Sequence, residues 1–237
     1  MSARLPHLTT IAFDADDTLW QNELYFRAAE DEFVRWLAEF ADRKTVEAHL
    51  LEVGKRNVPN IGFGMKTFTF SMIETAIDIS GGKVPAQTIA RILAAGKAML
   101  NHPVELLPGV GEVLEALASS YRLVLITKGD LFHQENKVRQ SGLSGMFEAV
   151  EIVSEKSADT YRQAFSRHGD GPTSSMMIGN SLKSDIIPAL QVGSWGVYVP
   201  HDLTWAFEHS EPPLHEPRYR EIKALDELAA LIQTIRD

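Results

Sequence analysis

The sequence contains no cysteine among its 237 residues. Disulfide bonds, thiolate catalysis and cysteine-ligated zinc are therefore excluded. Positive charge is also in short supply, because 23 lysines and arginines face 32 aspartates and glutamates, which gives a formal net charge of -9. An acidic balance of this kind opposes extended contact with nucleic-acid phosphates. We expect no nucleic-acid partner.

Long hydrophobic runs are missing too. No apolar segment approaches the length needed to span a bilayer, and the N-terminal segment MSARLPHLTT lacks the apolar stretch of a secretory signal. The sequence therefore predicts a cytoplasmic protein without a membrane partner, and it leaves the oligomeric state open. Apolar residues nonetheless make up 44% of the chain, which is enough to build a substantial core.

Short β-prone runs alternate with helical segments over much of the chain. The alternation predicts right-handed crossovers between parallel strands, and hence a sheet covered by helices on both faces. We therefore predict an α/β protein with a Rossmann-like parallel sheet core and a small α-helical cap domain. The expected strands are residues 8–13, 121–127, 149–153, 174–179 and 195–200.

One block of the chain shows helical periodicity without any strand signal. We predict a helical cap over residues 21–100, inserted into a catalytic core formed by residues 1–20 and 101–237. Within the cap, the segment NVPNIGFG is expected to break the pattern after the second helix. The proline-containing stretch 210–220 is expected to be an extended surface loop. The helices expected in the cap lie at about residues 22–40, 44–55, 67–79 and 85–100.

Polar side chains occur at the points where several predicted strands end. In an open parallel sheet the carboxyl ends of the strands converge on one crevice, which is where ligands bind. Each residue alone has an ordinary structural interpretation, as a turn or helix cap or as a solvated lysine. Their occurrence together, in this order, favours a single site. The residues are Asp14, Asp16, Thr127, Lys156, Asn180 and Asp185.

These residue types fit one reaction, the transfer of a phosphoryl group. A carboxylate such as Asp14 can attack phosphorus, and Mg²⁺ can screen the repulsion between the two anions. Asp16, two residues further on, can protonate the leaving oxygen and later activate water. Thr127 would donate its hydroxyl to the phosphoryl oxygens, and Lys156 would neutralise charge beside Asp14.

The same residues resemble the motifs of a known family. The pattern DxDxT is present as Asp14, Asp16 and Thr18, and it is followed by a strand ending in Thr127, by Lys156 and by the acidic motif GNSLKSD. The sequence is similar to the haloacid dehalogenase-like hydrolase superfamily, in its phosphatase branch. The resemblance implies a Rossmann-like core with a helical cap inserted after the first motif.

The acidic motif departs from the family pattern. Family phosphatases commonly carry aspartate where this chain has Asn180, so either Asn180 or Asp185 is the expected metal ligand. The resemblance implies that Mg²⁺ is held there together with Asp14 and the backbone carbonyl of Asp16. Halide-releasing members of the family lack an acid two residues after the nucleophile, so the presence of Asp16 favours phosphate over halide.

The function predicted from the sequence is magnesium-dependent hydrolysis of a small phosphomonoester, and the expected partner is a small phosphorylated metabolite. Three alternatives stay open. A phosphomutase would use the same aspartyl-phosphate, a signalling domain would keep the phosphoryl group on Asp14, and an inactive scaffold would fit the lost charge at Asn180. The long helical block and Asp16 argue against the signalling domain. The natural substrate is not identified by the sequence.

Overall fold

The computed structural model describes residues 7–203, 205 and 208–236. The chain divides into two compact units, which we call the sheet unit and the helical unit. The sequence predicts that the core runs without interruption from residue 101 onward. In the structure, the short segment Gly129–His133 belongs to the helical unit instead. The sheet unit comprises Met1–Glu23, Val104–Lys128 and Gln134–Asp237, and the helical unit comprises Leu24–Pro103 and Gly129–His133.

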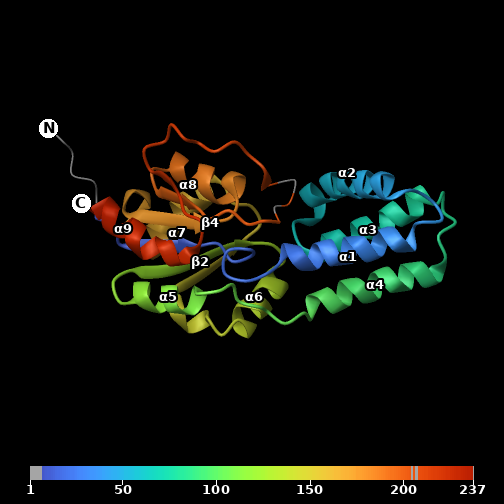
Figure 1. Ribbon diagram of the computed structural model, residues 1–237, viewed down its shortest axis with the longest axis horizontal. Helices are drawn as coiled ribbons and strands as arrows, with labels where there is room; N and C mark the ends of the chain where they lie inside the picture. Colours follow the sequence, from blue (N-terminus) through green and yellow to red (C-terminus); the bar gives the residue numbers. More distant parts are fainter. Residues whose placement is uncertain (1–6, 204, 206–207, 237) are drawn as a thin grey trace. The chain divides into compact units, whose positions relative to one another are not determined.

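A parallel sheet forms the centre of the sheet unit (Figure 1). Its strand order is β3-β2-β1-β4-β5-β6, and every neighbouring pair is parallel. In β1, Phe13 lies opposite Leu125 of β2 on one side and Ile178 of β4 on the other. The predicted α/β class and Rossmann-like sheet are thus confirmed. The strands are β1 (Thr10–Phe13), β2 (Arg122–Lys128), β3 (Ala149–Val153), β4 (Ser175–Gly179), β5 (Trp195–Tyr198) and β6 (Tyr219–Glu221).

Helices cover both faces of this sheet. Side chains alternate along a strand, so Ile11 and Phe13 of β1 face one way while Ala12 faces the other. The first face packs against α5, α6 and α9 and the second against α7 and α8; Figure 1 shows α8 on one side of the sheet and α5 and α6 on the other. These helices are α5 (Val110–Ala118), α6 (Leu131–Gln140), α7 (Ala158–His168), α8 (Ile187–Gln191) and α9 (Leu228–Arg236).

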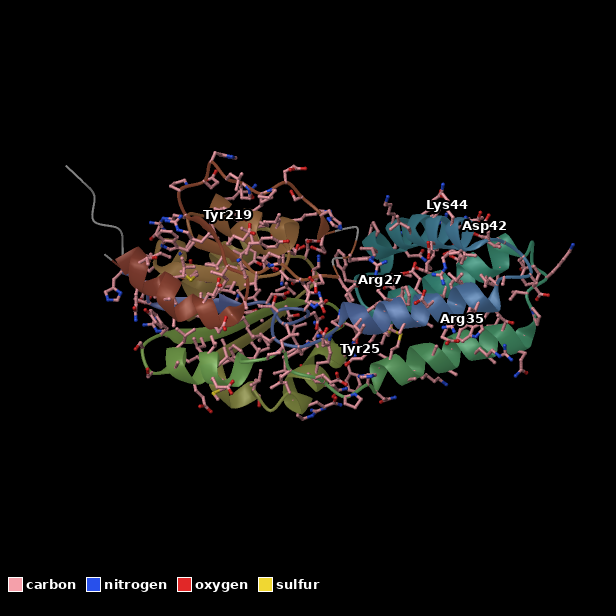
Figure 2. The ribbon with its side chains drawn as sticks, viewed as in Figure 1. Tyr25, Arg27, Arg35, Asp42, Lys44 and Tyr219 are labelled. Carbon is pink, nitrogen blue, oxygen red and sulfur yellow. The ribbon has the colours of Figure 1, made fainter. Side chains whose placement is uncertain are left out.

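The last strand corrects one expectation from the sequence. The stretch 210–220 is predicted as a surface loop, but its end enters β6, which pairs in parallel with β5. The strand is short and carries Arg220 and Glu221 at the edge of the sheet, so it lacks the apolar run that marks the other strands. Tyr219, labelled in Figure 2, is buried, and its hydroxyl donates to Glu221 at 2.9 Å.

The helical unit has a hydrophobic core of its own. Phe33 of α1, Leu50 of α2, Met72 of α3 and Ile92 of α4 are all buried in one cluster, which fits the amphipathic periodicity of the sequence. None of the helices in the described part of the chain is long and apolar enough to cross a membrane. The helices of this unit are α1 (Glu23–Trp36), α2 (Arg43–Ile61), α3 (Met65–Ile79) and α4 (Ala86–Leu100).

Helix α2 runs further than its sequence pattern predicts. The segment NVPNIGFG predicts a break, yet the helix continues to Ile61 with Pro59 in its last turn. A proline near a helix end removes a single backbone hydrogen bond, so the rest of the helix can tolerate it. The helix ends at Gly62, whose φ of 89° favours glycine. At its start, Asp42 accepts a hydrogen bond from the Thr45 backbone N–H at 2.8 Å (Figure 2).

Two glycines inside helices of this unit should respond oppositely to alanine. A Cβ at Gly96 of α4 would overlap Thr69 of α3, whereas a Cβ at Gly54 of α2 would meet nothing within 4 Å. Gly96→Ala should cost about 1–3 kcal/mol because α3 and α4 must separate. Gly54→Ala should stabilise by about 0.5–1 kcal/mol because alanine is the better helix former. Urea denaturation followed by circular dichroism measures both, and effects of the same sign would contradict this packing.

Candidate active site

The predicted site residues lie in the sheet unit, at or just after the carboxyl ends of its strands. Asp14 directly follows β1 and Asn180 directly follows β4. Thr127 is the last residue but one of β2, and Lys156 lies in the loop after β3. These four strands are neighbours in the sheet, so residues distant in sequence meet at one edge of it.

The turn after β1 is held by Asp17. This residue has a φ of 59°, a left-handed conformation that lets the chain turn sharply after Asp16. Its carboxylate accepts hydrogen bonds from the backbone N–H groups of Asn22 and Glu23, at 2.9 and 3.0 Å. Because Glu23 begins α1, Asp17 caps that helix. Of the three aspartates in the segment DADD, Asp17 is therefore a helix-capping residue, whereas Asp14 and Asp16 belong to the candidate site.

A buried lysine joins two carboxylates at the centre of the site. The Nζ atom of Lys156 donates to Asp14 and, at 2.6 Å, to Asp185. Burial alone would lower the pKa of Lys156, but Asp14 and Asp185 raise it above its usual range. Burial and Asp185 raise the pKa of Asp14 to about 8, and Lys156 offsets this only in part. Two carboxyl groups thus face one buried ammonium, so a bound cation would favour the ionised form of Asp14.

Both oxygens of Asp185 are engaged by the protein. Oδ1 accepts from Lys156, and Oδ2 accepts from the backbone N–H of Ser181 at 3.0 Å. The carboxylate is completely buried and belongs to a π-helical turn at Leu182–Ile186. It occupies the space beside Gly179, where a Cβ would overlap it. Asp185 is therefore placed to orient Lys156.

The side-chain amide of Asn180 faces Asp14 and the turn after β1. With its nitrogen turned inward, that nitrogen lies 3.2 Å from Oδ2 of Asp14 and 3.1 Å from the backbone oxygen of Asp16. With its oxygen turned inward, the amide accepts a hydrogen bond from the Thr18 hydroxyl at 3.2 Å. Three oxygens then converge: Oδ1 of Asn180, Oδ2 of Asp14 and the backbone oxygen of Asp16. Oxygen atoms are the ligands that Mg²⁺ prefers.

This arrangement fits a magnesium ion only if groups other than acidic side chains take part. Among the described residues, no group of three or more His, Cys, Asp or Glu side chains could hold a metal ion. The Asn180 amide and the backbone carbonyl of Asp16 supply the further oxygens beside Asp14. The donor set therefore fits the ion implied by the sequence, with two of its oxygens neutral.

Three donors surround the carboxylate of Asp16. Nε1 of Trp20 and Nζ of Lys137 each lie 2.6 Å from Oδ1, and Nε2 of Gln134 lies 3.1 Å from Oδ2. Burial would raise the pKa of Asp16, but Lys137 and the hydrogen bonds lower it below its ordinary value. The ionised carboxylate is therefore the favoured form of Asp16 in this geometry.

The same glutamine connects Asp16 to Thr127. Nε2 of Gln134 lies 2.6 Å from Oγ1 of Thr127, so one amide spans the end of β2 and the turn after β1. Both Thr127 and Gln134 are buried. Together with the contacts of Lys156 and Asn180, this hydrogen bond links all the residues predicted for the site into one network. The members predicted from the sequence are Asp14, Asp16, Thr127, Lys156, Asn180 and Asp185.

A second, half-buried ion pair supports the loop after β4. The carboxylate of Glu208 lies 2.6 Å from Nζ of Lys128 and 2.5 Å from the hydroxyls of Ser181 and Ser184. Burial would raise the pKa of Glu208, but Lys128 and the two hydroxyl donors lower it. Because Lys128 ends β2 and the serines follow β4, Glu208 ties two site-bearing loops together.

The sequence did not identify Gln134, Lys137 or Glu208. Gln134 and Lys137 are three positions apart, so they share one face of α6 next to Val138, which packs into the sheet core. Polar side chains on an inward helical face, close behind Thr127, are a signal that could have marked them. No spacing marks Glu208, which lies far from every motif in the sequence.

Comparisons with known proteins point to one family. The model of a family described as haloacid dehalogenase-like hydrolase matches residues 8–193. A solved haloacid dehalogenase-like family hydrolase from Xanthomonas campestris is 43% identical to this chain. The two structures have a TM-score of 0.86, and the match covers 97% of this chain and 92% of that one.

Two more distant solved structures share the fold. A HAD-type hydrolase from Bacillus subtilis, bound to magnesium, is 18% identical, with a TM-score of 0.65 over 95% of this chain and 99% of that one. A 2-haloacid dehalogenase from Pseudomonas syringae is 21% identical, with a TM-score of 0.60 over 96% of this chain and 99% of that one. A search of curated proteins found no match.

Replacing Glu208 by glutamine should lower the free energy of unfolding by about 1–3 kcal/mol near pH 7, because half-buried Lys128 and the hydroxyls of Ser181 and Ser184 lose a charged hydrogen-bond acceptor. Since the pKa of Glu208 lies below its ordinary value of 4.5, its contribution is complete above that pH and is lost as the pH falls through the lowered value. The difference between wild type and Glu208→Gln should therefore shrink below pH 4.5.

Urea denaturation at about pH 7 and about pH 3.5 measures this difference. Glu115→Gln, at an exposed position of α5, is the matched control and should change the free energy of unfolding little at either pH. A Glu208→Gln difference that grows on acidification would contradict the ion pair.

Proposed function

Because this chain belongs to the haloacid dehalogenase-like hydrolase family, we propose that it hydrolyses a small phosphomonoester through an aspartyl-phosphate on Asp14. Membership makes the chain a hydrolase, and the choice of phosphate as the reacting group is the proposal. The competing chemistry is represented by the solved 2-haloacid dehalogenase from Pseudomonas syringae. A small phosphorylated metabolite is the substrate class that we propose.

The observation that carries the proposal is Asp16. Displacement of a halide from carbon needs no proton donor, because halide is a weak base, whereas an alkoxide leaving group needs a proton. Asp16 stands two residues after the nucleophile, and its carboxylate shares the Gln134 amide with Thr127. Asp16 can supply this proton, and the neighbouring Thr127 hydroxyl can donate a hydrogen bond to a phosphoryl oxygen. This pairing supports phosphoryl transfer.

In the first step, a carboxylate oxygen of Asp14 forms a bond to phosphorus while the bond from phosphorus to the leaving oxygen breaks. Asp16 takes up a proton before this step, since its donors favour the carboxylate at rest, and it gives that proton to the leaving oxygen. Lys156 orients Asp14 and balances its charge. Thr127 donates its hydroxyl to a phosphoryl oxygen.

In the second step, water replaces the departed alcohol. The carboxylate of Asp16 removes a proton from the water, whose oxygen forms a bond to phosphorus. The bond between phosphorus and Asp14 breaks, so inorganic phosphate leaves and Asp14 regains its carboxylate. Asp16 again carries a proton and is ready for the next substrate.

We propose that Asp14, the backbone carbonyl of Asp16 and Asn180 hold Mg²⁺. When bound, the ion supplies screening between the nucleophile and the phosphoryl group. Asp185, the other candidate ligand, already has its oxygens engaged by Lys156 and Ser181, which favours a positioning role. Magnesium in the solved relative from Bacillus subtilis supports the choice of metal.

Wild-type protein with Mg²⁺ should release phosphate from p-nitrophenyl phosphate, and Asp14→Asn should lower kcat by about a thousandfold or more, because the nucleophile is lost. Removal of the metal with EDTA should also abolish turnover, and added Mg²⁺ should restore it. Asp159→Asn is the matched control, because the Asp159 side chain is 76% exposed and forms a surface ion pair with Arg162.

The same preparations distinguish the competing chemistry. Halide release from 2-chloropropionate should be undetectable in the wild type. Halide release together with no phosphatase activity would overturn the proposal, as would full phosphatase activity in Asp14→Asn. A panel of phosphorylated metabolites would then identify the natural substrate.

Asn180→Asp should lower the Mg²⁺ concentration that gives half-maximal activity by about threefold to tenfold, because a carboxylate adds a negative charge at the metal. The measurement is a titration of activity with Mg²⁺ at saturating substrate. Asn101→Asp, at an exposed position of the helical unit, should leave that concentration unchanged. An unchanged or higher concentration in Asn180→Asp would exclude Asn180 as a ligand.

A further inference from the structure

Gln134 has no part in the motifs of the sequence, yet it lies at the centre of the polar network. It is 2% exposed, on the inward face of α6. Its Nε2 atom lies 2.6 Å from Oγ1 of Thr127, 3.1 Å from Oδ2 of Asp16 and 3.1 Å from the backbone oxygen of Lys128. Its Oε1 atom is buried and has no hydrogen-bond partner among the described residues.

The surroundings determine which way the amide points. The backbone oxygen of Lys128 can only accept hydrogen bonds, so the amide nitrogen must face it. Turning the amide over would place Oε1 against that oxygen and against the Asp16 carboxylate, where three acceptors would repel one another. The nitrogen therefore faces inward even though Oε1 is left without a described partner.

This orientation settles the role of the Thr127 hydroxyl. An amide nitrogen cannot accept a hydrogen bond, so Gln134 donates and Oγ1 of Thr127 accepts. Among the residues that the structure describes, the Thr127 hydroxyl has no other hydrogen-bond partner, although it is only 1% exposed. Its single hydrogen is thus kept for an acceptor that is not part of the described chain.

We propose that Gln134 is a positioning residue that directs the Thr127 hydroxyl toward the phosphoryl group and holds Asp16 beside it. Without the amide, no described hydrogen bond holds the hydroxyl, so it can rotate away from the phosphoryl group and is then lost as a donor to substrate. This inference rests on the proposed phosphoryl transfer. It adds a residue that does not itself touch the reacting atoms.

The helix that carries Gln134 strengthens its effect. Lys137, three residues later on α6, lies 2.6 Å from Oδ1 of Asp16, while Gln134 contacts Oδ2. One helical face therefore supplies a separate donor to each oxygen of the acid/base carboxylate. The two hydrogens of the Gln134 amide are shared among this carboxylate, the Thr127 hydroxyl and the backbone oxygen of Lys128, so Nε2 connects Asp16 to Thr127.

The test compares Gln134→Met, which keeps the size of the side chain and removes its N–H donors, with the wild type in the presence of Mg²⁺ and p-nitrophenyl phosphate. We expect kcat to fall about tenfold to a hundredfold, with KM changing less than about threefold. Inhibition by vanadate, which mimics the five-coordinate phosphorus of the transition state, should weaken by a similar factor. Gln140→Met, exposed at the end of the same helix, is the matched control.

A double-mutant cycle separates orientation of the hydroxyl from general damage to the fold. In a Thr127→Val background the hydroxyl is already absent, so adding Gln134→Met should lower kcat by several-fold less than it does in the wild type, and the remaining loss should reflect the contact with Asp16. Full additivity of the two losses, or wild-type kcat in Gln134→Met, would overturn the proposal. If Gln134→Met fails to fold by circular dichroism, Gln134→Leu, which also lacks the N–H donors, takes its place in the same cycle, with the same expected coupling to Thr127.

The activity of the wild type distinguishes a failure of the proposed function from a failure of the role proposed for Gln134. A wild type without phosphatase activity would overturn the proposed function, and this inference with it. An active wild type that loses activity in Asp14→Asn but not in Gln134→Met would leave the proposed function standing and overturn the role of Gln134 alone.

Discussion

The ammonium of Lys156, held between Asp14 and Asp185, is the interaction on which the site depends. All three groups are buried: Lys156 and Asp14 come from the loops after β3 and β1, and Asp185 comes from the π-helical turn that follows β4. Removing one partner of such a cluster leaves an uncompensated buried charge, which typically costs about 3–5 kcal/mol. The second carboxyl group beside the single ammonium also makes the centre receptive to a cation, which would favour ionisation of Asp14. The same contacts thus serve the packing of the sheet edge and the proposed chemistry.

Around this centre, neighbouring donors hold the remaining groups in place. Gln134 and Lys137 fix Asp16 from α6, and Glu208 joins Lys128 to the loop after β4. A site of this kind is arranged before substrate binds, so little reorganisation is needed during the reaction. This arrangement leaves Oε1 of Gln134 buried and without a hydrogen-bond partner among the described residues, which is energetically unfavourable.

Departures from the sequence-based fold have local physical reasons. The end of α2 was misplaced because Pro59 lies in a last turn, where the loss of one hydrogen bond is tolerated. Strand β6 was missed because three residues with two charged side chains carry no apolar pattern, and only pairing with β5 creates it. Gly129–His133 belongs to the helical unit because of its spatial contacts, and contacts of this kind cannot be read from the local sequence pattern.

The alternation of strands and helices, and the strand-end positions of residues such as Asp14, Thr127 and Lys156, can be predicted from the amino-acid order alone, because apolar runs and the polar residues that end them are local features. The sequence also places Asp16 two residues after Asp14, which favours phosphoryl over halide chemistry. The folded chain was needed to see that Asp17 caps a helix, that Asp185 holds Lys156, and that Gln134 and Glu208 join the network. Those roles depend on the direction of side chains across the sheet edge, and direction is set by packing between segments far apart in the chain.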